Sequence, residues 1–126
     1  MARNKRSLVN HKSFLPPQVK PICETWPLLE RLAYHQTSTH RLTFKEDVES
    51  YRLCGARAFG AWRIKVEDFG EFRAFDLLKE RGLSVSSLSW AGGFAYADGE
   101  AYDAAIADAL DAVKMAQTLE ASCLVV

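Results

Sequence analysis

The apolar residues that follow position 31 occur in two patterns that alternate along the chain. Four short apolar runs have the length and composition of β-strands, at 32–37, 56–62, 83–88 and 123–126. The segments between them carry apolar residues three and four positions apart, the spacing of an amphipathic helix. The pattern therefore predicts strands and helices in alternation.

Clear start and stop signals bound the first two helices. Thr43 and Glu46 form a capping box, and Gly55 stands where a left-handed residue ends the first helix. The second helix is predicted over 66–81 with a break near Gly70, and Gly82 ends it. Its apolar stripe consists of Phe72, Phe75, Leu78 and, at its margin, Leu77.

The third helix, over 100–119, has the plainest division into two faces. One face carries the apolar residues Tyr102, Ile106, Leu110 and Val113. The other carries Asp103, Asp111, Lys114 and Thr118.

The order βαβαβαβ with short links predicts an α/β fold with a parallel sheet and right-handed crossovers. Two architectures fit this order: a doubly wound sheet, and the N-terminal portion of a (β/α)₈ TIM barrel with about four strands and three helices. The last run, 123–126, resembles a buried strand that lacks neighbours, so we expect the chain to be the front part of a larger fold.

Charge and proline divide the chain into a leader and a domain. Residues 1–28 contain all four prolines and five basic residues against a single Glu, a balance of +4, and we predict an irregular basic leader there. Residues 29–126 are predicted to form the partial barrel domain. The net charge of the whole chain is zero, which argues against bulk electrostatic binding to nucleic acid or to an anionic membrane.

The same composition indicates a cytoplasmic protein. No apolar run approaches the ~20 residues of a membrane helix, and no apolar region follows the basic N-terminus as in a secretory signal. The three cysteines, Cys23, Cys54 and Cys123, are odd in number and lack CxxC spacing, so we expect reduced thiols that lie mostly in the core.

Polar and aromatic residues near the predicted strand ends are the candidates for chemistry. Alternation predicts that only one of His35 and Gln36 points into a barrel. Arg63, after Trp62, could clamp a phosphate or carboxylate, or could simply pair with Glu67 or Asp68.

The loop after the third strand and the helical carboxylates have alternative interpretations. The segment Trp90–Phe94 contains a Gly-Gly pair that would either let backbone approach a ligand or make a tight turn. The helical carboxylates are expected on solvated faces; they are Glu46, Asp47, Glu49, Asp103, Asp108 and Asp111. No inward pair of acids is evident at the strand ends, so the sequence predicts no complete metal site in this chain.

Five segments, taken in order, resemble the start of a sugar phosphate isomerase/epimerase of the xylose-isomerase-like TIM-barrel superfamily. They are Thr43–Gly55, Gly60–Arg63, Val66–Gly70, Gly82–Leu88 and Trp90–Phe94. The resemblance covers about residues 31–126 and implies a (β/α)₈ barrel that isomerises or epimerises a small sugar or polyol.

The resemblance also implies that metal ligands and substrate-binding residues lie in different parts of such a barrel. A divalent metal (Mg, Mn or Zn) would be held by Glu, Asp and His residues of later strands, so no cofactor is expected for this chain alone, and its own activity is left open. The early strands would line the substrate pocket, and the residues expected to contact a sugar or polyol are Gln36, Trp62, Arg63 and Trp90.

Two other functions remain as alternatives. A non-catalytic half-barrel could self-associate through its exposed strand edges, with two copies burying the strand at Leu124 against each other. A nuclease of the endonuclease IV type, in the same superfamily, would need a metal cluster and a basic DNA-binding face, which the sequence does not offer.

Overall fold

A computed structural model describes residues 31–96 and 98–126. The strands are β1 (Ala33–His35), β2 (Ala58–Trp62), β3 (Ser84–Ser89) and β4 (Leu124–Val125). The α-helices are α1 (Phe44–Leu53), α2 (Arg63–Phe69), α3 (Glu71–Arg81) and α4 (Gly99–Thr118), and two short 3₁₀ helices are η2 (Gln36–Thr39) and η3 (Phe94–Tyr96). The boundary predicted between residues 28 and 29 lies outside the described residues.

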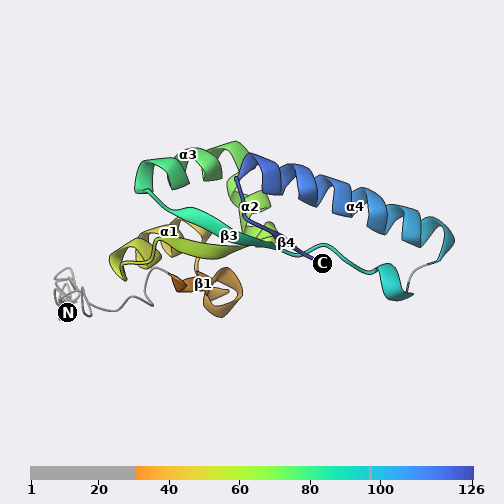
Figure 1. Cartoon of the computed structure of the whole chain (residues 1–126), viewed down its shortest axis with the longest axis horizontal. Coiled ribbons are helices and arrows are strands. Elements are labelled where there is room, and N and C mark those ends of the chain that lie inside the picture. The colour runs from red at the N-terminus through yellow and green to blue at the C-terminus, as the bar shows by residue number, and fades with distance from the viewer. Residues whose placement is uncertain (1–30, 97) are drawn as a thin grey trace, which may run out of the picture.

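All strand pairs in the sheet are parallel, and the strand order is β1-β2-β3-β4 (Figure 1). Each successive strand is added on the same side of its predecessor. A doubly wound sheet reverses direction at a switch point, whereas a barrel adds its strands in sequence. The fold is therefore a parallel α/β sheet with the strand order of the first portion of an α/β barrel.

The helix boundaries follow the local signals in the sequence. Thr43 and Glu46 form both hydrogen bonds of the capping box at the start of α1. The long helix predicted over 66–81 is broken at Gly70, as expected, but α2 already begins at Arg63. Gly82 adopts φ 66° and ends α3, because a left-handed residue there is least costly when it lacks a Cβ.

The core fills the space between the helices and one face of the sheet. Phe59 and Ala61 of β2 and Val85 and Leu88 of β3 turn toward the helices and are buried. The helices contribute Phe44, Val48, Tyr51, Val66, Ala74, Leu78, Met115 and Leu119. Leu124 of β4 packs against this core, so its side chain faces the helices of its own chain.

Two predictions about buried positions are wrong. Phe72 is 76% exposed, because α3 uses Ala74 and Leu78 for its inner face. Cys54 and Cys123 are exposed thiols instead of core residues, and Cys23 lies outside the described residues. The apolar residues grouped on one face of the last helix are exposed, whereas α4 turns Ala112 and Met115 inward.

Candidate functional site

The carboxyl ends of β1, β2 and β3 bring polar and aromatic side chains together on the face of the sheet opposite the helices. His35 lies in register with Gly60, and Trp62 with Ser89. Residues in register on parallel strands point to the same side, so these residues share one face. The prediction that only one of His35 and Gln36 points to this face is confirmed: His35 does, and Gln36 belongs to η2.

The hydrogen bonds of His35 assign its tautomer and the role of Ser89. The backbone N–H of Thr37 donates to Nδ1 at 3.2 Å, so Nδ1 carries the lone pair and Nε2 the proton in the neutral ring. Nε2 then donates to Ser89 Oγ at 2.8 Å. His35 is therefore no general base for Ser89 in this state; instead, its donation leaves the Ser89 hydroxyl proton available to a further acceptor.

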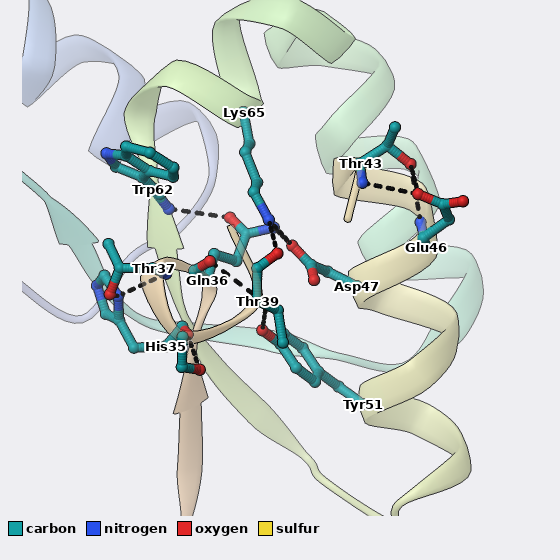
Figure 2. Close-up of polar contacts among 11 residues, drawn as sticks. His35, Gln36, Thr37, Thr39, Thr43, Glu46, Asp47, Tyr51, Trp62 and Lys65 are labelled. Carbon is teal, nitrogen blue, oxygen red and sulfur yellow. Dashed lines mark hydrogen bonds and ion pairs between the residues drawn. The ribbon is translucent and has the colours of Figure 1, made fainter. Parts of the chain in front are cut away.

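Gln36 is fully buried and connects the site to an ion pair behind it (Figure 2). Its amide oxygen accepts from the backbone N–H of Trp62 at 2.9 Å, and its amide nitrogen donates to Asp47 Oδ2 at 3.0 Å. Lys65 Nζ donates to the same oxygen at 2.6 Å and to Thr39 O at 2.8 Å. These contacts fix the end of β2 to η2 and α1.

The charges of that pair are removed from water. Asp47 is 0% exposed and Lys65 is 6% exposed. Burial of a single charge would be very unfavourable, and mutual attraction plus shared hydrogen bonds offset that cost. The expectation that Asp47 lies on a solvated helix face is therefore wrong; it holds the loop that carries the site.

Arg63 ties the strand end to α4. Its guanidinium donates to both carboxylate oxygens of Asp108, at 2.9 and 2.8 Å, and to the backbone oxygen of Trp90 at 3.2 Å. Glu67 lies 3.4 Å away, so one of the two predicted helical partners is present. The hydrogen bonds from Arg63 hold the pKa of Asp108 below its usual value, and Asp108 in turn raises the pKa of Arg63.

The four residues predicted to contact substrate therefore fall into two groups. Trp62 is half-buried on the site face, in register with Ser89, and Trp90, the next residue along the chain after Ser89, is 61% exposed. Arg63 holds Trp90 in place and is largely covered. Gln36 lies behind Trp62 with its amide engaged on both sides, so direct contact between Gln36 and a ligand stays a prediction.

Sequence reasoning missed three members of this arrangement: Asp47, Ser89 and Asp108. Asp47 lies at an ordinary helical position, and only the fold brings Lys65 and Gln36 to it. Ser89 could have been found by extending the third strand one residue to the carboxyl end, where sites of parallel sheets lie. Asp108 is 45 residues from Arg63, and no local signal relates them.

The described residues do not fit a divalent metal by themselves. No three His, Cys, Asp or Glu side chains gather anywhere in residues 31–96 and 98–126. Both ring nitrogens of His35, the one imidazole at this site, are already hydrogen-bonded.

Comparison with models of protein families found no match, and neither did comparison with curated proteins. Among solved structures, the chain is similar to the crystal structure of protein SMc04130 from Sinorhizobium meliloti 1021, with 29% sequence identity and a TM-score of 0.71. The match covers 76% of this chain and 35% of that one, so this chain spans about a third of its length. That description names no activity, and the likeness supports the fold.

None of the helices in the described part of the chain combines the length and apolarity that crossing a bilayer requires.

Proposed function

We propose that this chain supplies the substrate-binding portion of a sugar phosphate isomerase/epimerase-like barrel and that its ligand is a small sugar or polyol. The observation that carries the proposal is that Trp62 and Ser89 lie in register at the carboxyl ends of β2 and β3, with the exposed Trp90 directly after β3. That edge is where barrel enzymes place their sites. In the full-length form of such a protein, we propose isomerisation or epimerisation of this ligand with a divalent metal.

Each residue has a task that suits a polyhydroxyl ligand. The indoles of Trp62 and Trp90 offer flat apolar surfaces for the C–H face of a sugar ring. The Ser89 hydroxyl, which accepts from His35, can donate to a ligand oxygen. Arg63 positions the backbone of Trp90. Its guanidinium is not free to bind an anionic ligand, because it already forms a bidentate pair with the carboxylate of Asp108.

This occupation of Arg63 favours an uncharged ligand over a phosphorylated one. A phosphate bound to Arg63 would have to displace Asp108 and would meet Glu67 at close range. A neutral polyol needs no such exchange. The proposal therefore expects tighter binding of the unphosphorylated member of any sugar pair.

The proposal is tested by titrating the purified chain with pairs of pentoses, hexoses and inositols and their phosphates while following tryptophan fluorescence. We expect saturable binding of at least one neutral compound in the millimolar range or below. W62F and W90F should each weaken binding about tenfold, whereas F72L, which alters an exposed aromatic on α3, should not.

Absence of saturable binding up to about 50 mM for every compound would overturn the proposal, because a millimolar site would be filled at that concentration. Equal losses of binding in F72L and W62F would also contradict it, since they would show that the site lies elsewhere.

A further inference from the structure

Helix α4 exposes four of its large apolar side chains. Tyr102 is 44% exposed, Ile106 38%, Leu110 57% and Val113 42%. These residues recur at intervals of four, four and three, which places them on one side of the helix, here called the α4 stripe. The core is reached instead by Ala112, Met115 and Leu119.

A continuous apolar stripe on a helix is more than the scattered exposed apolar residues that soluble proteins usually carry. The helix that carries it lies on the same side of the sheet as α3 (Figure 1), and β4 pairs with β3 at one edge of that sheet. Val125 of β4 is also 45% exposed. The stripe therefore has the character of a surface that associates with another protein element.

We propose that the α4 stripe is the interface of a homodimer in which two α4 helices pack antiparallel. An antiparallel pair related by a two-fold axis places residue i of one copy opposite residue 217 − i of the other when the axis passes between residues 108 and 109. The centre of the stripe lies close to this point.

The charges beside the stripe suit this register. Asp103 and Lys114 lie eleven residues apart, or about 17 Å along the helix. Both lie on the same flank of the stripe, at about 100° and 120° from Tyr102 on the helical wheel. In the proposed pair, Asp103 of each copy therefore faces Lys114 of the other, which gives two symmetric ion pairs.

The rest of the chain does not oppose this association. The formal net charge is zero, so two copies approach without long-range repulsion. Lys114 is bound at 2.8 Å to Asp111 of its own helix, but both side chains are about 70% exposed, and such a pair is weak enough to exchange. The proposal is independent of the sugar-binding function.

Sedimentation equilibrium of the full chain provides the test. We expect a monomer–dimer equilibrium in the micromolar range, and L110D should weaken it by about a hundredfold because a charge would replace the most exposed apolar residue of the stripe. L53D is the matched control, because Leu53 is 76% exposed on α1 and lies outside the stripe, and it should leave the dimer unchanged. Far-ultraviolet circular dichroism verifies that both variants are folded.

Charge reversal tests the register. D103K and K114D should each weaken the dimer by about fivefold, because each replaces both ion pairs with like-charge contacts. The double variant D103K/K114D restores opposite charges and should recover the original dissociation constant. A chain that stays monomeric at about 200 µM, or a dimer that L110D leaves intact, would overturn the proposal and assign the stripe to a different partner.

Discussion

At the scale of single residues, the ion pair between Asp47 and Lys65 bears most directly on the site. Both charges are buried, and Gln36 transmits their position to the backbone of Trp62. Asp47 Oδ1 is buried without a hydrogen-bond partner among the described residues, so Oδ2 receives both bonds. The pair therefore makes the position of the Trp62 indole depend on a residue of α1.

Removal of one partner of this pair should be strongly destabilising. D47N leaves the Lys65 ammonium buried without its counter-charge, and we expect the free energy of unfolding in urea to fall by about 3 kcal/mol. D68N changes an exposed Asp and should cost less than about 0.5 kcal/mol. In D47L/K65M both charges are absent, so the double variant should lose much less free energy of unfolding than the sum of the losses of D47L and K65M measured singly. Equal losses of stability in D47N and D68N would contradict the assignment of Asp47 and Lys65 as a buried ion pair.

Gly60 is the second residue on which the site depends. A Cβ at this position would collide with Cδ2 of the His35 ring and would press on Ser87 Oγ at 3.1 Å. G60A should therefore displace His35, break its hydrogen bond to Ser89 and lower the free energy of unfolding by about 2 kcal/mol. The substitution H35A removes the ring with which the new Cβ collides, so G60A should lower the free energy of unfolding less in an H35A background than in the wild type. An equal decrease in both backgrounds would show that the clash does not involve His35.

At the scale of elements, Arg63 and Asp108 fasten the start of α2 to α4. The pKa of Asp108 is lowered in the folded chain by the hydrogen bonds from Arg63. Because the pKa of Asp108 is lower in the folded chain, its contact with Arg63 contributes stability fully when the pH is above the pKa of Asp in the unfolded chain, about 3.9. This contribution is lost as the pH falls through the lower pKa of the folded chain. Acid should therefore loosen α4 before it affects helices that lack such a contact.

The stability difference between the wild type and D108N should show this dependence. We expect D108N to be less stable in urea near pH 7, and the difference should shrink as the pH falls below the unfolded value of about 3.9 and through the lowered folded pKa of Asp108. Asp108 is half exposed, so the difference will be small and will decrease in high salt. A difference that stays constant between pH 7 and pH 3 would show that the carboxylate charge is not what D108N removes.

The elements also show which features a sequence can predict and which it cannot. The capping box at Thr43 and the break at Gly70 are local, because each depends on residues at most a few positions apart, and both were predicted. The burial of Asp47 and the outward turn of Leu110 depend on which face each helix presents to the sheet. Periodicity groups residues on a face but does not say which face packs inward when a helix has apolar residues on more than one side.

At the scale of the whole molecule, the strand order distinguishes between the two architectures that the sequence left open. Alternating strands and helices fit both a doubly wound sheet and a barrel, because the choice depends on which side of the sheet each new strand joins. The observed order β1-β2-β3-β4 is that of a barrel portion, and the likeness to part of a longer solved chain agrees with it. Pairs such as His35–Ser89 follow only from that order and register.

A sugar or polyol site at the strand ends is tested most directly by ¹H–¹⁵N spectra of the full chain recorded during titration with a neutral polyol, in which two of the three indole N–H signals report on Trp62 and Trp90. We expect saturable shifts of the Trp62 and Trp90 indole signals and of the Ser89 backbone amide, with no shift of the backbone amide of Leu53 at the end of α1. Spectra that do not change up to about 50 mM, or shifts that spare all three strand-end residues, would contradict the assignment of a sugar or polyol site to this edge of the sheet.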